Sequence, residues 1–203
     1  MSDEVVDIFK VAGLDKPDIS ILSDEFLAEV RGLPQRNLAI ELLQRLINDT
    51  IKTRTKRNLV QSHSFSEMLE QTLRKYQNRS IEAAQVIEEL IQLAKDIKQA
   101  QGRGGELGLN EDEVAFYDAL AQNESAVDVL GDDGLKVIAV ELVKTVRANV
   151  TVDWTIKETV RANLRRLVRR TLKKYGYPPD LEESAVQAVL AQAEQLADVW
   201  TAK

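Results

Sequence analysis

The chain has 203 residues, with 27 Lys and Arg, 33 Asp and Glu, one His and no Cys, and its formal net charge is −6. The lack of cysteine excludes disulfides, thiolate metal sites and cysteine nucleophiles, and a single histidine excludes sites built on paired histidines. Nine glycines, four prolines and 5% aromatic residues are too few for the turns and strands of an all-β domain. The composition therefore predicts a helical protein.

The hydropathy pattern gives no sign of a membrane or export signal. No stretch approaches the ~18 uninterrupted apolar residues of a membrane-spanning helix. The start of the chain, residues 1–4, is acidic and lacks the basic-then-apolar order of a signal peptide. We expect a soluble, cytoplasmic protein without a membrane partner.

The first half of the chain contains several predicted helices. A short apolar-periodic run covers 23–31, and a clear helical period begins at Leu38. Ser64-Phe65-Ser66-Glu67 has the form of a capping box and predicts a helix start. Ser80 is expected to cap a further long helix, which we expect to end at the glycines of 102–105.

The second half is divided by glycine and proline. The sequence 110–113 predicts a helix start, because its three acids would lie beside the free amides of the first turn. Gly-Asp-Asp-Gly at 131–134 is expected to break the chain before a helix over about 135–150. A basic helix is predicted over 156–175, introduced by a capping box that begins at Thr155. Pro178-Pro179 should end this region, because proline lacks an amide donor.

A final helix is expected to run toward Trp200, capped by Asp180 and Glu183. The sequence thus predicts an all-α fold, a bundle of roughly seven to nine helices without strands. It is either one domain or two sub-bundles. The predicted divisions are an N-terminal sub-bundle at 1–101, a glycine-rich hinge at 102–109 and a C-terminal sub-bundle at 110–203.

Motifs that suggest catalysis do not have the required spacing. The glycines of 102–105 follow a helix and lack the third glycine of a dinucleotide fingerprint, and no Gly-Lys-Ser/Thr occurs. The acids of 128–134 lack the calcium-loop spacing. Pro17-Asp18 and Asp96-Ile97-Lys98 resemble parts of a nuclease motif, but the second element lies on a predicted amphipathic helix. Lone His63 provides no nucleophile–base pair. We expect no catalytic residue, cofactor or metal in this chain.

The charges are arranged in blocks. Residues 105–135 carry nine acids and no base, whereas residues 136–177 carry eleven bases and three acids. Neighbouring blocks of opposite charge attract if the fold brings them together. The question is whether the acidic block covers the basic one.

The predicted basic helix contains the strongest candidate binding residues. Its apolar stripe is Ile156, Val160, Leu164, Leu167, Val168 and Leu172. The flanking bases are Lys157, Arg161, Arg165, Arg169 and Lys173, with Arg166, Arg170 and Lys174 one residue on, and Trp154, Tyr175 and Tyr177 stand at its ends. Arginine suits bidentate pairing with carboxylate or phosphate.

Three interpretations of these bases are open. They could pair with the acidic block inside the protein, dock an acidic protein surface, or contact nucleic-acid phosphates. Trp154 and Tyr177 lie outside the basic stripe, which is more typical of core anchors than of base-stacking platforms.

Several long segments, in the same order along the chain, carry a family resemblance. They are 16–27, 74–79, 116–120, 123–126, 152–158, 160–164 and 174–179. Together they closely resemble the C-terminal helical region of type I restriction enzyme R subunits, from about Val5 to Trp200.

The resemblance implies a much longer parent protein. In R subunits, a nuclease domain and two RecA-like motor domains, which use ATP and Mg²⁺, precede the helical region. None of their motifs is present here, so the resemblance implies a non-catalytic fragment that begins after the motor. It also implies a role: attaching the R subunit to the methylase and specificity subunits. DNA contact through the basic helix is the alternative.

Overall fold

The structure is a computed structural model that describes residues 23–55, 57–149 and 158–201. Within these ranges it contains eight α-helices, one short 3-10 helix and no strand, so the all-α prediction is confirmed. The chain divides into two compact units. The first comprises 1–54 and 62–102, and the second comprises 55–61 and 103–203.

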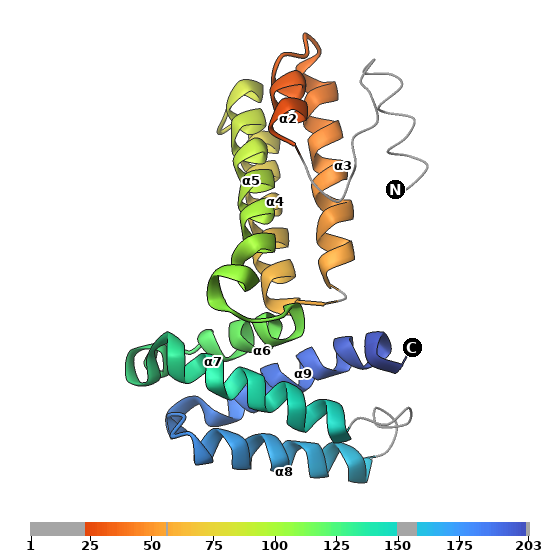
Figure 1. Cartoon of the computed structure of the whole chain (residues 1–203). Helices are drawn as coiled ribbons and strands as arrows, with labels where there is room; N and C mark the ends of the chain where they lie inside the picture. Colours follow the sequence, from red (N-terminus) through yellow and green to blue (C-terminus); the bar gives the residue numbers. More distant parts are fainter. Residues whose placement is uncertain (1–22, 56, 150–157, 202–203) are drawn as a thin grey trace. The chain divides into compact units, whose positions relative to one another are not determined.

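The first unit is built from α2 (Asp24–Arg31), α3 (Arg36–Thr55), α4 (Leu59–Gln77) and α5 (Ala83–Leu107), the last two contributing most of their length. The three long helices lie side by side (Figure 1). Apolar residues three and four positions apart form one buried stripe on each helix. The residues with no exposed surface include Leu42, Leu43, Leu46, Ile47, Val86 and Leu90.

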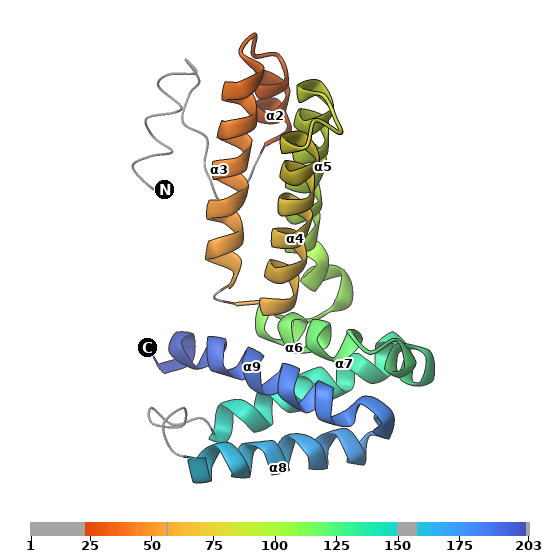
Figure 2. The same cartoon turned by 180° about the vertical axis from the view of Figure 1, so that it is seen from behind.

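The second unit is a ring of four helices: α6 (Glu111–Ala121), α7 (Glu124–Asn149), α8 (Glu158–Lys174) and α9 (Glu182–Thr201). Both α6 and α8 pack against α7 and α9, so α6 and α8 occupy opposite corners of the ring (Figures 1 and 2). The enclosed core includes Phe116, Leu120, Leu135, Ile138, Leu142, Val168 and Leu196.

Two sequence-predicted boundaries are confirmed. α6 begins with a complete capping box: the Asn110 side chain accepts from the amide of Glu113 at 3.0 Å, and the Glu113 carboxylate accepts from the amide of Asn110 at 2.8 Å. The expected break near 131–134 is a kink inside α7, where Gly131 has φ +62° and ψ 179°. Positive φ is accessible to glycine because it lacks a Cβ.

The predicted start of α4 is wrong. Ser64 lies inside the helix, which begins at Leu59. Asn58 provides the cap instead, since its side-chain oxygen accepts from the amide of Gln61 at 3.1 Å. Ser64 and Glu67 have capping spacing, but Asn58, whose side chain also donates to Asp118, caps the helix six residues earlier.

The predicted start and end of α5 are also wrong. The helix begins at Ala83, not after Ser80, because Arg79 adopts φ +54° and the amide of Ser80 closes the end of α4 on the carbonyl of Lys75. It continues through 102–105 to Leu107. The terminating residue is Gly108, with φ +68°.

Gly104 has a different function, because a Cβ at this position would lie 2.8 Å from the carbonyl oxygen of Leu109. The amide of Leu109 donates to the carbonyl of Gly104 at 2.9 Å, so the chain folds back closely over this residue. The lack of a side chain at Gly104 therefore lets the chain turn back closely at the end of α5. The proposed hinge at 102–109 stays a prediction.

The break between α8 and α9 is present, but the predicted cap is wrong. α8 ends at Lys174, Gly176 has φ +74°, and a 3-10 turn, η1 (Pro179–Leu181), precedes α9. Asp180 accepts from the Ser125 hydroxyl at 3.0 Å. Glu183 forms an ion pair with Arg169. Asp180 therefore holds η1 to α7, and Glu183 holds α9 to α8. The predicted capping box at 155–158 lies mostly outside the described residues.

Candidate functional site

α8 lies at one edge of the second unit, with one side in the core and the other in solvent. The buried side chains, spaced three and four residues apart, are Leu164, Val168, Thr171 and Leu172. The remaining surface is dominated by bases. Because α8 and α6 lie at opposite corners of the helix ring, α7 and α9 are the described helices that flank the basic surface (Figures 1 and 2).

Some of the α8 bases form ion pairs with these two flanking helices. The pairs are Arg161 with Glu194 (3.3 Å), Arg169 with Glu183, Lys173 with Glu182 (3.8 Å) and Lys174 with Glu141 (3.9 Å). The first three carboxylates lie on α9 and the fourth on α7. The hydrogen bond from Arg169, with a smaller contribution from Gln187, lowers the pKa of the Glu183 carboxyl.

Within the described residues, no ion pair joins the basic helix to the acidic 105–135 block, so the interpretation in which the two neutralise each other has no support there. The acids of that block have other partners: Asp112 accepts from the Trp200 indole at 2.8 Å and Asp133 pairs with Lys136 at 3.3 Å. Glu111 forms an ion pair with Arg57. Part of the reason is topological, because α6 carries four of the nine acids of the block and lies diagonally across the ring from α8.

Three arginines on α8 are exposed and have no ion pair within the described part of the chain: Arg165, Arg166 and Arg170. Arg166 donates to the side-chain oxygen of Asn163 at 2.8 Å, a neutral partner that leaves its charge uncompensated. Arg165 is close enough to Glu183 to contribute to the lowered pKa of that carboxyl. The basic surface is therefore only partly neutralised.

These arginines surround an open hollow of about 560 Å³. It is lined by Ala162, Arg165, Arg166, Arg169, Arg170 and Lys173. Ala162 is exposed and is the one lining residue without a charge. We refer to these six residues as the α8 basic face. The face thus combines five positive charges around one small apolar residue.

The remaining sequence-predicted candidates are not part of this face. Trp154 and Lys157 lie outside the described residues. Tyr177 is buried, and its hydroxyl donates to the carbonyl of Leu120 at 3.0 Å. Burial raises the pKa of Tyr177. Tyr177 is therefore a core residue of the second unit and does not contact a partner from the surface.

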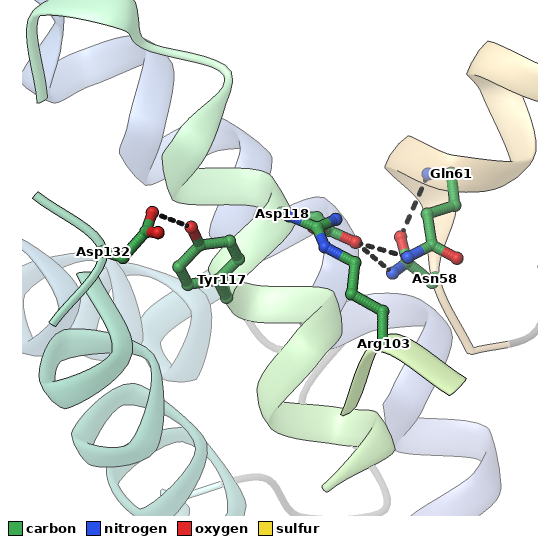
Figure 3. Close-up of polar contacts among 6 residues, drawn as sticks. All are labelled: Asn58, Gln61, Arg103, Tyr117, Asp118 and Asp132. Carbon is green, nitrogen blue, oxygen red and sulfur yellow. Dashed lines mark hydrogen bonds and ion pairs between the residues drawn. The ribbon is translucent and has the colours of Figure 1, made fainter. Parts of the chain in front are cut away.

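A buried polar cluster on α6 was not among the sequence-predicted sites. The Asp118 carboxylate accepts from the side-chain amides of Asn58 at 2.8 Å and Gln61 at 2.7 Å, and from the Arg103 guanidinium at 2.7 Å (Figure 3). The Asp118 side chain is only 5% exposed. Asp118 therefore ties together three segments distant in sequence, all within the second unit.

The same cluster extends to Tyr117. The Arg103 guanidinium lies 5.4 Å from the centre of the Tyr117 ring. The Tyr117 hydroxyl donates to the Asp132 carboxylate at 2.7 Å (Figure 3). Burial, and then the hydrogen bond to Asp132, raise the pKa of Tyr117 to about 12. A second buried group, Gln192 on α9, donates to the carbonyl of Arg57 at 2.7 Å and accepts from the amide of Leu59 at 3.0 Å. These contacts are structural.

The sequence contained one usable signal for this cluster. Asp118 is the only charged residue in the run Val114–Leu120, whose seven residues are all buried. A carboxylate within such a run requires partners, because an unpaired buried charge is costly. The identities of Asn58, Gln61 and Arg103 could not be read from the pattern.

The described residues contain no cluster of metal-ligating side chains. In residues 23–55, 57–149 and 158–201, no three His, Asp or Glu side chains are placed to hold a metal ion together. His63 is exposed and lies 3.5 Å from Glu67, one helical turn away. No helix among the described residues combines the length and apolar character required to cross a bilayer.

Comparison with known proteins identifies the family to which the chain is related. Residues 1–199 match the model of the family described as type I restriction enzyme HindI endonuclease subunit-like, C-terminal. The chain is 41% identical over 200 residues to the type I restriction enzyme HindI endonuclease subunit of Haemophilus influenzae, covering 98% of this chain and 19% of that protein.

A second relative is the putative type I restriction enzyme MjaIXP endonuclease subunit of Methanocaldococcus jannaschii, 34% identical over 174 residues, which are 85% of this chain and 17% of the relative. The chain thus spans about a fifth of the length of the curated relatives it matches. No solved structure shows a significant match. The chain belongs to the type I restriction enzyme HindI endonuclease subunit-like C-terminal family.

Proposed function

We propose that this chain is a non-catalytic assembly domain, which docks a type I restriction endonuclease R subunit onto its methylase and specificity subunits. The observation that carries the proposal is the family match over residues 1–199, a region that is 19% of the HindI relative. ATP-dependent DNA translocation and cleavage, with ATP and Mg²⁺, would belong to the rest of such a subunit.

The construction of the two units supports a binding role. Each has its own hydrophobic core, with Leu42 and Leu46 completely buried in the first and Leu135 and Ile138 in the second. Asp118 and Gln192, two buried polar groups of the second unit, are held by protein partners. A preorganised helical domain presents a fixed surface, which reduces the entropy lost on association.

Co-purification of the full-length R subunit with its cognate methylase core tests this role. Removing the region that corresponds to this chain should abolish recovery of the complex. ATPase activity of the truncated subunit is the control for a folded motor. An excess of the 203-residue chain should also compete with the full-length subunit for the core. Assembly that survives the truncation would refute the proposal.

A further inference from the structure

We propose that the α8 basic face binds the phosphate backbone of duplex DNA, independently of sequence. This function goes beyond docking to other subunits. Three of its bases, Arg165, Arg166 and Arg170, have no ion pair in the described part of the chain. The other two pair with α9: Arg169 with the exposed Glu183, and Lys173 with Glu182 at 3.8 Å.

The ion pairs with α9 do not neutralise the face permanently. Arg169 and Lys173 are 43% and 70% exposed as side chains. The Arg169–Glu183 pair is exposed on both sides, and such pairs contribute little to stability, so Arg169 can exchange its carboxylate for a phosphate at small cost. The Glu182 side chain is only 13% exposed, but the Lys173 ammonium lies 3.8 Å from it and has three donors, so it can contact a phosphate while it stays beside Glu182. Glu182 and Glu183 lie along the α9 flank and repel phosphate there. The favoured approach is therefore over Arg166 and Arg170, which lie away from that flank.

The composition of the face favours nucleic acid over an acidic protein surface. Protein interfaces have an apolar centre with aromatic anchors, and charged residues are depleted there. The α8 basic face has charges at its centre, and Ala162 is its only apolar residue. Specific protein–DNA interfaces are more polar and far more positive than interfaces between proteins.

The face also favours a duplex over a single strand. Single-strand binding relies on aromatic side chains on which bases stack, and none lines this hollow. Guanidinium groups match phosphate geometry through paired hydrogen bonds. Arg166 and Arg170 are four residues apart, or about 6 Å along the helix axis, so they can contact separate phosphates on one backbone.

Fluorescence anisotropy of the 203-residue chain with a 30-bp duplex of mixed sequence tests the proposal. The NaCl concentration is varied from 25 to 100 mM. Five phosphate contacts predict that affinity falls about 500-fold over this range, because the logarithmic slope is about −0.9 per contact. The triple variant R165Q/R166Q/R170Q leaves two contacts, so its affinity should fall only about 12-fold over the same range.

The matched control is K52Q/R74Q/K95Q, which removes three exposed positive charges from the first unit. It should bind the duplex as the unchanged chain does. Circular dichroism should show that both variants fold, because the three α8 arginines form no ion pair among the described residues.

Several results would overturn the proposal. One is no binding of the unchanged chain at 25 mM NaCl, and another is equal weakening by the two triple variants. Tighter binding of a single strand of the same length would refute the proposal that the ligand is duplex DNA. Loss of methylase-core binding by R165Q/R166Q/R170Q with unchanged DNA affinity would assign the face to a protein partner. The DNA assay contains no other subunit, so its outcome is separate from that of the docking test.

Discussion

At the residue scale, Asp118 shows how a single carboxylate organises the second unit. It accepts hydrogen bonds from Asn58 and Gln61 and forms an ion pair with Arg103, although it lies in the middle of a buried helix. Asn58 precedes α4, Gln61 lies in its first turn, and Arg103 lies near the end of α5. One carboxylate therefore links α6 to two other segments of the chain.

Replacing Asp118 with alanine should destabilise the protein by about 3 kcal/mol, because two buried amides and a guanidinium lose their acceptor. The urea midpoint of unfolding measures the effect. Asp133→Ala is the matched control: its side chain is 99% exposed, and it should change stability by less than about 0.5 kcal/mol. Equal midpoints for the two variants would show that the cluster is not structural.

The raised pKa of Tyr117 predicts that the protein loses stability at alkaline pH. The folded pKa of Tyr117, about 12, exceeds the unfolded value of about 10, so its contribution is complete below pH 10 and is lost as pH rises through 12. The loss is about 2 to 3 kcal/mol. Free energies of unfolding at pH 8, 10 and 11.5 should decline less in Tyr117→Phe. A parallel decline in both proteins would contradict the prediction.

At the element scale, helix ends are decided by contacts as well as by local sequence. The capping box at Asn110 forms as its sequence predicts, because all its groups lie within one turn. Ser64 has similar spacing with Glu67, yet Asn58 starts α4 six residues earlier. Asn58 is held by Asp118, sixty residues away, and no local pattern contains that contact.

The two glycines Gly102 and Gly104 should respond oppositely to alanine. At Gly102 an added Cβ meets nothing within 4 Å, so Gly102→Ala should raise stability by up to about 1 kcal/mol through helix propensity. At Gly104 it would clash with the carbonyl oxygen of Leu109, so Gly104→Ala should cost about 1 to 3 kcal/mol. Thermal unfolding measures both, and shifts of the same sign would contradict this interpretation.

At the scale of the whole molecule, the arrangement of charge matters more than the net charge of −6. The acidic 105–135 block adjoins the basic 136–177 block in sequence, but α6, which carries four of the nine acids, and α8 pack on α7 and α9 at opposite corners of the ring. Four bases of α8 form ion pairs, three of them with α9 and one with α7. Within the described residues, three arginines of α8 have no ion pair.

If the α8 basic face binds phosphate, removing the carboxylates beside it should strengthen binding. E182Q/E183Q frees Arg169 and Lys173, and we expect duplex affinity to rise about 2- to 5-fold at 25 mM NaCl. The control E67Q/E70Q makes the same change in net charge on α4, in the first unit. Anisotropy titrations should show a rise in duplex affinity for E182Q/E183Q and not for E67Q/E70Q. Equal rises in affinity for both variants would indicate an effect of net charge alone.

The sequence alone determined the helical class, most helix cores and the amphipathic nature of α8, because these depend on propensity and on periodicity within one element. It also carried the family resemblance that the comparisons bear out. Only the tertiary structure decided which bases remain unpaired, that Tyr177 is buried, and that Asp118 joins Asn58, Gln61 and Arg103. Those outcomes depend on which helices become neighbours in the ring, and charge attraction between segments adjacent in sequence is too weak to impose that order against burial of the apolar stripes.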